Sequence, residues 1–223
     1  MQIIIVGTGI LANELLTGLR ARHNQVTPWA ERDQGNEKSI VIHAGSGREL
    51  IDVAAYCHET HSPLIELATG SQMEAAPSGF PVVLCPNTNI LMLKFMNMLN
   101  KSGHLFSDYN IEIIESHQTQ KTSVPGTAVS IAHSLGLHAG DVRSVRDPDE
   151  QSTALQIPAE HLGRHAYHRI VVEDPACTVT METRVFGASP YADGVARIIL
   201  AICANALEDR IYEINEFVEN GWL

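Results

Sequence analysis

The amino-terminal part of the chain alternates between short apolar runs and segments in which apolar residues recur at helical spacing. Residues 3–6 form a run rich in β-branched side chains that stops at a glycine-rich turn, and leucines then recur from Leu11 to Leu19. Further strand-type and helical runs follow at residues 28–30, 39–43, 50–58, 63–67, 81–85 and 90–99. Short strands that alternate with helices predict a parallel sheet covered by helices on both faces.

The pattern changes beyond this part of the chain. Apolar and polar side chains alternate, as in half-buried antiparallel strands, at residues 109–115, 166–173 and 178–186. Residues 127–135 have a helical pattern, whereas 143–160 are expected to form an irregular connection. A strongly apolar helix at 195–206 ends the predicted elements, and we expect it to pack back on the first domain.

At 223 residues and 24.4 kDa the chain is long enough for two small domains, each with its own core. The change of pattern predicts a first domain from residues 1–95 and 190–223, and a second domain from residues 96–189. Apolar residues make up 44% of the chain and charged residues 18%, so we expect the whole chain to fold. The predicted fold class is α/β, with a smaller α+β mixed-sheet domain beside the parallel sheet.

The formal net charge of −11 argues against binding to nucleic acid or to an anionic membrane, because either partner requires a basic surface. The first residues lack the features of a signal peptide, and no run approaches the length of a membrane-spanning helix, so we expect a cytoplasmic protein. The four cysteines are far apart, which favours buried, reduced thiols. No histidine pair at helical spacing accompanies an acidic ligand, so no metal is expected.

A dinucleotide-binding fingerprint follows the first predicted strand. The sequence Gly7-Thr8-Gly9-Ile10-Leu11-Ala12 fits the pattern G-x-G-x-x-[G/A] between a strand and a helix. The first glycine permits a tight turn, and the second lets the backbone approach a pyrophosphate at the helix amino end. Glu31 follows the second strand, where a carboxylate accepts from a ribose hydroxyl. Arg32 is either a solvated charge or a group that stacks on adenine or pairs with a 2′-phosphate, so NADH or NADPH is the expected cofactor.

The segment 115–128 carries the residues best suited to catalysis. His117 leaves a predicted strand at its carboxyl end, Lys121 follows on a loop, and Gly126-Thr127 opens a helix whose free N–H groups suit a carboxylate. These parts fit the reduction of a cyclic C=N bond, or of a conjugated equivalent, in a carboxylate-bearing substrate, which needs a proton donor and fixed partners for the carboxylates. Taken alone, His117 is more simply explained as a histidine that packs or caps at a strand end.

The order of these motifs resembles the dihydrodipicolinate reductase family. The pattern Glu-x-His-x-x-x-Lys-x-x-x-Pro-Gly-Thr-Ala from Glu115 onward is similar to that family's signature. Similar positions also occur in the loop Ala68-Thr69-Gly70-Ser71, in the segment Cys85-Pro86-Asn87-Thr88-Asn89-Ile90, and in Tyr191-Ala192-Asp193-Gly194-Val195. Four motifs in the same order cover almost the whole chain.

The resemblance implies a Rossmann dinucleotide-binding domain completed by the carboxyl-terminal helix, and a domain for substrate binding and homotetramer formation. It implies that His117 is the acid and that Lys121 is a second proton donor or a carboxylate partner. Gln118, Lys121, Gly126 and Thr127 would bind a small dicarboxylate substrate. Cofactor contacts would come from Gly7, Thr8, Gly9, Ile10, Leu11, Glu31, Arg32, Ala68, Thr69, Gly70, Pro86, Asn87 and Thr88.

Several positions depart from the family pattern and leave alternatives open. Gln118 replaces a histidine, Ser123 replaces an aspartate, a serine before Gly126 is missing, and Ala188 replaces an arginine. The substrate pocket has therefore lost cationic character. The chain is interpreted as the reductase of diaminopimelate and lysine biosynthesis, as a related dehydrogenase of another amino or imino acid, or as a nucleotide sensor with a degenerate site.

The remaining charged and imidazole side chains are expected to lie at surfaces. The other histidines are expected at the surface or at the tetramer interface, including His133, His138, His161, His165 and His168. The acidic residues Asp147, Asp149 and Glu150, near Arg143 and Arg146, are interpreted as a solvated loop.

Overall fold

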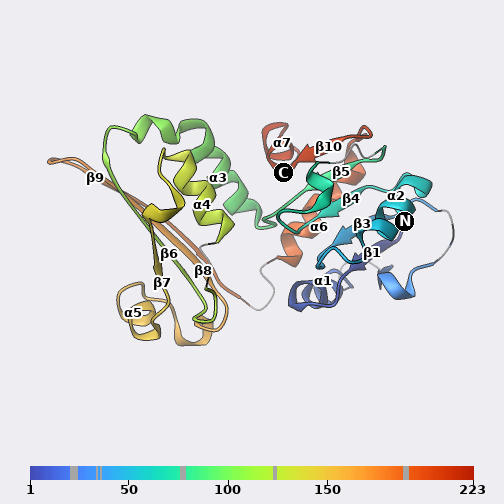
Figure 1. The fold of residues 1–223 in the computed structure, drawn as a ribbon, viewed down its shortest axis with the longest axis horizontal. Helices are drawn as coiled ribbons and strands as arrows, with labels where there is room; N and C mark the ends of the chain where they lie inside the picture. Colours follow the sequence, from blue (N-terminus) through green and yellow to red (C-terminus); the bar gives the residue numbers. More distant parts are fainter. Residues whose placement is uncertain (21–24, 34, 36, 76–78, 123–124, 188–190) are drawn as a thin grey trace. The chain divides into compact units, whose positions relative to one another are not determined.

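A computed structural model describes residues 1–20, 25–33, 35, 37–75, 79–122, 125–187 and 191–223. It divides into two compact units, coloured by sequence in Figure 1. Unit 1 comprises Met1–Leu93 and Tyr191–Leu223, and unit 2 comprises Lys94–Pro190.

Unit 1 contains a parallel sheet of six strands in the order β10-β5-β4-β3-β1-β2. The strands are β1 (Ile3–Val6), β2 (Val26–Pro28), β3 (Ile40–His43), β4 (Leu64–Glu66), β5 (Val82–Leu84) and β10 (Ile211–Glu213). All their pairings are parallel. The predicted α/β class with a Rossmann-like sheet is confirmed.

Helices cover both faces of this sheet because successive strand residues point to opposite sides. Ile3 and Ile5 lie in one core with residues of α1 (Ile10–Arg20) and α6 (Ala192–Ala204). Ile4 and Val6 lie in the other core, against α2 (Leu50–Thr60). The expected packing of the late apolar helix on this domain is thus observed.

Two elements after α6 were not foreseen. β10 pairs with β5 and forms an edge of the sheet, and α7 (Ile214–Glu219) follows it. Tyr212 and Phe217 are buried and their rings lie 6.1 Å apart, edge to face. A three-residue strand is too short to give a recognisable alternation, so only its pairing with β5 defines it.

Unit 2 contains a mixed sheet in the order β7-β6-β8-β9. Its strands are β6 (Asn110–His117), β7 (Val142–Val145), β8 (Ala166–Glu173) and β9 (Thr178–Val185). The β6–β8 and β8–β9 pairs are antiparallel, whereas β6–β7 is parallel. The helices are α4 (Gly126–Ser134), α5 (Pro148–Thr153) and α3 (Ile90–Ser102), which begins in unit 1.

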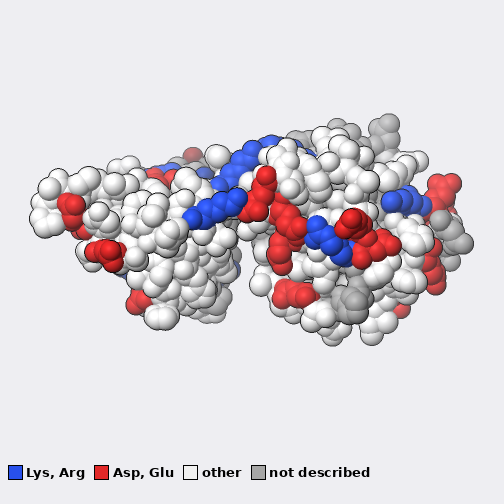
Figure 2. All heavy atoms as spheres, turned by 90° about the horizontal axis from the view of Figure 1, so that it is seen from above, with Lys and Arg blue, Asp and Glu red and all other residues white. Residues whose placement is uncertain are grey.

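Short 3-10 helices lie in the connections of both units. They are η1 (Trp29–Glu31), η2 (Gln72–Glu74), η3 (Gly103–Phe106), η4 (Ala139–Asp141) and η5 (Ala159–His161). No helix among the described residues is long and apolar enough to cross a membrane. Figure 2 shows acidic and basic side chains next to one another in patches, and large areas of the face seen there carry neither.

The prediction of an irregular connection at 143–160 is wrong. Within it lie most of β7 and all of α5, and the aliphatic residues Leu155 and Ile157 are buried beside Ile114 and Tyr167. α5 is short but well capped, since the Asp147 side chain accepts from the amide of Glu150 at 2.9 Å and Pro148 occupies the first turn. The capping aspartate and proline were the available signals for this helix.

The expectation for the cysteines is only half correct. Cys57 and Cys85 are buried free thiols, but Cys177 and Cys203 are exposed. Cys177 lies between β8 and β9, and Cys203 lies in the last turn of α6.

Candidate functional site

His117 and Glu115 form a pair at the end of β6. Residues two apart on a strand point to the same side, so both side chains lie on one face of the mixed sheet. Nδ1 of His117 lies 2.8 Å from Oε2 of Glu115. The Glu115 side chain is fully buried, whereas that of His117 remains 14% exposed. A carboxylate behind an exposed imidazole fixes the orientation of the ring and leaves Nε2 for a substrate.

The Glu115 carboxylate is kept ionised by its partners. Nη2 of Arg146 donates to Oε1 at 2.5 Å, and the hydroxyl of Ser144 donates to the same oxygen. Burial alone raises the pKa of Glu115, but hydrogen bonds from His117, Arg146 and Ser144 outweigh it and lower the pKa to about 2. Glu115 is therefore a fixed negative charge beside His117.

Two further histidines lie beside His117, so their predicted positions at a surface or interface are wrong. His165 is 5% exposed and His168 is 2% exposed, and their ring centroids lie 6.4 Å and 5.8 Å from that of His117. Burial and then the charge of His117 lower the pKa of His168 to about 4. Burial likewise lowers the pKa of His165. Both rings are thus neutral near neutral pH. His133 and His138 are exposed, as expected.

Buried polar groups connect these histidines to the strand ends. Nε2 of His165 lies 2.9 Å from Oγ of Ser116, and the side-chain amide of Gln151 donates to that oxygen and to the carbonyl of His117. His168 is opposite Glu115 on the paired strand β8. The cross-strand register, which the sequence alone does not give, explains why these residues meet.

Arg146 joins the Glu115 carboxylate to the loop that carries Lys121. Its Nε donates to the backbone carbonyl of Lys121 at 2.9 Å, while Nη2 holds Glu115. The interpretation of Arg146 as part of a solvated loop is wrong. By contrast, Arg143 pairs with Glu150 and both are substantially exposed, as expected for a solvated ion pair. Arg146 directly follows β7, so predicting that strand from the sequence would have placed Arg146 beside β6.

The proposed substrate-binding residues follow His117. Gln118 and Lys121 are half-buried, and the Lys121 amide donates to the Gln118 carbonyl at 3.0 Å. Gly126 and Thr127 open α4, whose preceding residue Pro125 supplies no side-chain cap. A Cβ on Gly126 would meet no atom within 4 Å, so space lies above this helix end. Ser123 and Ala188 lie outside the described residues.

In unit 1 the glycine-rich turn has the backbone that a dinucleotide site requires. Gly7 has φ of 121°, and a Cβ there would lie 2.5 Å from the carbonyl oxygen of Ala44. Gly9 has open space around its Cα, and Thr8, Gly9 and Ile10 are exposed at the start of α1. β1 lies between β2 and β3, so this turn sits at the carboxyl end of the strand where the order of the sheet reverses. Leu11 is partly buried against the core.

Glu31 and Arg32 follow β2 at one side of this turn. Glu31 is exposed, whereas the Arg32 guanidinium lies 3.5 Å above the Trp29 ring and donates to the Trp29 carbonyl at 2.9 Å. Arg32 is therefore a stacked group and not a freely solvated charge. The arrangement suits a planar adenine or a ribose phosphate beside the Glu31 carboxylate.

On the other side of β1, the ends of β3 and β4 enclose a cavity of about 350 Å³. Its lining residues are His43, Gly45, Ser46, Gly47, Leu50, Ala68, Thr69, Gly70, Ser71 and Gln72. Ala68, Thr69 and Gly70 are thus brought together around one cavity. The segment with Pro86, Asn87 and Thr88 follows the neighbouring strand β5 and does not line this cavity.

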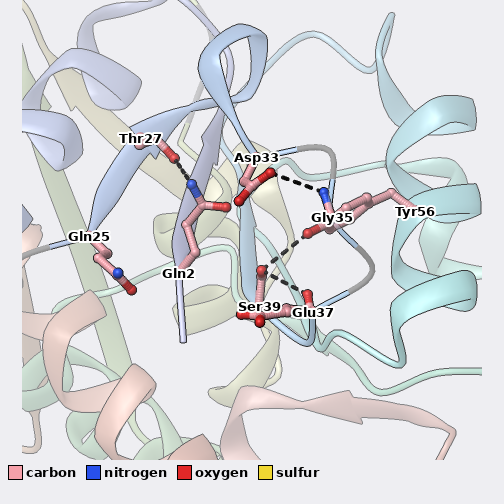
Figure 3. Close-up of a pocket in the computed structure, with 8 residues that line it drawn as sticks. All are labelled: Gln2, Gln25, Thr27, Asp33, Gly35, Glu37, Ser39 and Tyr56. Carbon is pink, nitrogen blue, oxygen red and sulfur yellow. Dashed lines mark hydrogen bonds between the residues drawn. The ribbon is translucent and has the colours of Figure 1, made fainter.

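Another hollow, of about 240 Å³, is lined by polar groups of unit 1 (Figure 3). Gln2, Gln25 and Ser39 line it and directly precede β1, β2 and β3, so it lies at the amino ends of the strands. Ligands of open parallel sheets bind at the carboxyl ends. The charged residues around it, Asp33 and Glu37, would repel a phosphate. This hollow therefore does not suit a dinucleotide.

A parallel Rossmann-like sheet with a glycine-rich first turn, joined to a mixed sheet that carries a buried glutamate beside a partly exposed histidine, defines a class of two-domain α/β proteins. The chain belongs to the dihydrodipicolinate reductase family: a family model described as "Dihydrodipicolinate reductase, C-terminus" matches residues 90–218, more than half of its 223 residues.

Relatives named as 4-hydroxy-tetrahydrodipicolinate reductases match about half of the chain. "Probable 4-hydroxy-tetrahydrodipicolinate reductase 1, chloroplastic" of Oryza sativa subsp. japonica is 34% identical over 126 residues, which are 52% of this chain and 37% of that protein. "4-hydroxy-tetrahydrodipicolinate reductase 2, chloroplastic" of Arabidopsis thaliana is 32% identical over 126 residues, which are 52% of this chain and 36% of that protein. The chain thus spans little more than a third of the length of these relatives.

A solved structure shares the fold over nearly the whole chain. The dipicolinate-bound dihydrodipicolinate reductase of Paenisporosarcina sp. TG-14 has a TM-score of 0.66 and covers 96% of this chain and 97% of its own, at 14% sequence identity. Both units, including the parallel sheet that lies largely outside the family-model match, therefore have the family's fold.

Proposed function

We propose that this protein is an NAD(P)H-dependent reductase that converts 4-hydroxy-tetrahydrodipicolinate, or the dihydrodipicolinate formed from it, to tetrahydrodipicolinate in lysine and diaminopimelate biosynthesis. The observation that carries the proposal is the exposed His117 held by the buried Glu115, four residues before Lys121, within the segment that matches the family model. Relatives named as 4-hydroxy-tetrahydrodipicolinate reductases support the same reaction.

Unit 1 fits a dinucleotide by its own geometry. The turn at Gly7 admits no Cβ, the start of α1 is exposed, and a cavity lies at the ends of β3 and β4. The residues proposed to hold the cofactor are Gly7, Thr8, Gly9, Ile10, Leu11, Glu31, Arg32, Ala68, Thr69, Gly70, Pro86, Asn87 and Thr88. When bound, NADH or NADPH supplies a hydride to carbon.

Unit 2 supplies the proton and the contacts to the substrate. His117 would deliver a proton from Nε2 to the atom next to the carbon that receives the hydride, while Glu115 balances the charge of the protonated ring. Lys121 would donate a second proton or bind a carboxylate of the dicarboxylate substrate. Gln118 and the amides of Gly126 and Thr127 would bind the other carboxylate. Units 1 and 2 would thus be the cofactor-binding and substrate-binding domains.

We also propose that the protein assembles as a homotetramer through unit 2. β9 is the last strand of the mixed sheet, and Val179 on it is 41% exposed. An edge strand with exposed apolar side chains is a site at which another copy can pair. Size-exclusion chromatography with light scattering tests this assembly, and a monomer at micromolar concentration would contradict it.

The activity test mixes the purified protein with freshly formed product of dihydrodipicolinate synthase and follows oxidation of NADH and of NADPH. We expect saturable oxidation that is lost in His117→Ala and Lys121→Ala, with cofactor affinity retained. Glu112→Gln is the matched control, because Glu112 is exposed on the same strand.

Other results would select other functions. Tight cofactor binding without oxidation, together with oxidation in the presence of a different imino acid, would identify a dehydrogenase of that substrate, which the loss of cationic character at Gln118 favours. Cofactor binding with no imino acid turned over would leave a nucleotide sensor.

A further inference from the structure

His43 and Glu66 form a buried pair in unit 1 that neither the fingerprint nor the proposed reaction uses. They end the neighbouring strands β3 and β4 and are directly opposite in the register. Nδ1 of His43 lies 2.7 Å from Oε1 of Glu66, and both side chains have no exposed surface. A buried polar pair usually stabilises a core no better than apolar residues of similar volume do, so core stability alone does not explain this pair.

Glu66 also orders the loop after β4. Its Oε1 accepts from the Ala68 amide at 2.8 Å, and its Oε2 accepts from the Ser71 hydroxyl at 2.9 Å. An ionised carboxylate only accepts hydrogen bonds, so Nδ1 of His43 carries the proton that it donates to Glu66. In the neutral ring, Nε2 then has a lone pair and acts as an acceptor.

Nε2 of His43 has no hydrogen-bond partner in the part of the chain that the structure describes. His43 is one of the residues around the 350 Å³ cavity at the ends of β3 and β4. A Cβ on Gly45 would lie 3.0 Å from Nε2, so any larger residue at position 45 would place a side chain directly against this buried nitrogen. A buried acceptor without a donor is costly unless a ligand completes it.

The position of the cavity indicates which part of a dinucleotide would reach it. Glu31 and Arg32 follow β2 on one side of β1, whereas His43 and Glu66 end β3 and β4 on the other side. A dinucleotide that crosses the turn at Gly7 places its two halves on opposite sides of β1. With adenosine at Glu31 and Arg32, the nicotinamide half faces the cavity, and its primary amide is a donor that matches Nε2.

We propose that His43 is a specificity-determining residue of the cofactor site, which accepts a hydrogen bond at Nε2 from the nicotinamide carboxamide while Glu66 fixes its ring. The inference rests on the proposed function, because it requires that unit 1 binds a nicotinamide dinucleotide.

The test measures affinities of the full chain by calorimetry for NAD⁺, for 3-acetylpyridine adenine dinucleotide and for ADP-ribose. The acetylpyridine analogue carries a methyl group in place of the amide nitrogen and so cannot donate to Nε2. We expect the unsubstituted protein to prefer NAD⁺ over the analogue by about 3- to 10-fold, the value of one hydrogen bond. In His43→Asn, whose amide can still donate to Glu66 but which lacks Nε2, this preference disappears while ADP-ribose affinity is unchanged.

Gly45→Ala provides a second variant in which the pair itself is intact. Its Cβ covers Nε2, so the preference for NAD⁺ is again expected to disappear, with ADP-ribose as the control for the rest of the site. Circular dichroism establishes whether each variant is folded. If His43→Asn does not fold, the affinities of Gly45→Ala alone test the role of His43.

The outcomes separate this inference from the proposed function. Equal affinity of the unsubstituted protein for NAD⁺ and the analogue, or a preference that survives in the folded variants, overturns the role of His43 and leaves dinucleotide binding intact. Failure of these three ligands and of NADP⁺ to bind the unsubstituted protein overturns dinucleotide binding, and the role of His43 with it.

Discussion

At the scale of single residues, the chemistry of unit 2 centres on one buried carboxylate. Glu115 receives hydrogen bonds from His117 in β6, from Ser144 in β7 and from Arg146, which directly follows β7. The neighbouring imidazoles of His165 and His168 have lowered pKa values, so they do not compete with His117 for a proton near neutral pH. Of these three histidines, His117 is the one that is partly exposed, so it is the one suited to act as an acid.

Glu115→Gln tests whether this carboxylate positions His117. The amide keeps the shape of the side chain but removes the charge that stabilises a protonated ring. We expect kcat to fall by about 10- to 1,000-fold while KM for the cofactor changes little. Glu112→Gln on the same strand serves as the control. A Glu115→Gln protein with unchanged kcat would assign Glu115 a structural role only.

The buried groups also predict how stability depends on pH. The folded pKa of His168 is about 4 against an ordinary 6.5, so the unfolded chain takes up this proton first as the pH falls. Stability is therefore lost as the pH falls from 6.5 to 4, by on the order of 3 kcal/mol from this group alone. Glu115, with a folded pKa of about 2 against 4.5, adds a further loss between pH 4.5 and 2.

Urea unfolding at a series of pH values measures this dependence. His168→Asn should flatten the slope between pH 6.5 and 4, because the titrating ring is gone. His133→Asn, at an exposed position in α4, should leave the slope unchanged. An unaltered slope in His168→Asn would show that other groups dominate the acid transition.

At the scale of elements, α6 lies very close to the segment before α3. A Cβ on Gly194 would lie only 1.6 Å from the carbonyl oxygen of Thr88, so glycine lets the helix backbone approach the Pro86–Thr88 segment. The same contact fixes a segment proposed to border the cofactor. The local apolar pattern thus determines that α6 is a helix. The glycine at position 194, which has no side chain, determines how closely α6 packs against the Pro86–Thr88 segment.

Gly194→Ala is expected to destabilise the protein by about 1 to 3 kcal/mol or more, because backbone has to shift to admit the methyl group. Thermal unfolding followed by circular dichroism measures the loss. Gly163→Ala is the matched control, since a Cβ there meets no atom within 4 Å. Equal melting temperatures for the two variants would contradict the close approach of α6.

At the scale of the whole molecule, unit 1 is discontinuous in sequence. Its core takes residues from the first 93 positions and from α6, β10 and α7, including Val195, Ile198 and Phe217. Unit 2 is a single continuous segment with its own mixed sheet and apolar cluster. The core of unit 1 therefore requires the carboxyl-terminal residues, whereas the core of unit 2 does not.

Removal of Tyr191–Leu223 is expected to unfold unit 1 while unit 2 keeps its structure. The loss of α6, β10 and α7 uncovers part of the sheet face that α1 also covers, and it removes a large share of the apolar burial in that core. Hydrogen exchange measured by mass spectrometry should show unprotected amides in β1 and β3 and protected amides in β6 and β8. Protection retained in both sheets would mean that α6 is dispensable.

The sequence by itself determined the class of the fold and the positions of the main chemical groups. Periodicity identified β1, β3 and α1, because their burial on defined faces imposes a regular apolar pattern. The fingerprint at Gly7 and the segment from Glu115 to Thr127 were recognisable because their chemistry needs particular residues at fixed spacings. The predicted membership of the dihydrodipicolinate reductase family is confirmed.

Only the tertiary structure decided which distant residues meet. The pairing of β6 with β7 and β8 brings Arg146 and His168 to Glu115, and the pairing of β3 with β4 brings His43 to Glu66. β7 and β10 are too short to show a period, so their neighbours in the sheets define them. These residues meet because strand register sets side-chain neighbours across long separations in sequence, and local patterns carry no information about that register.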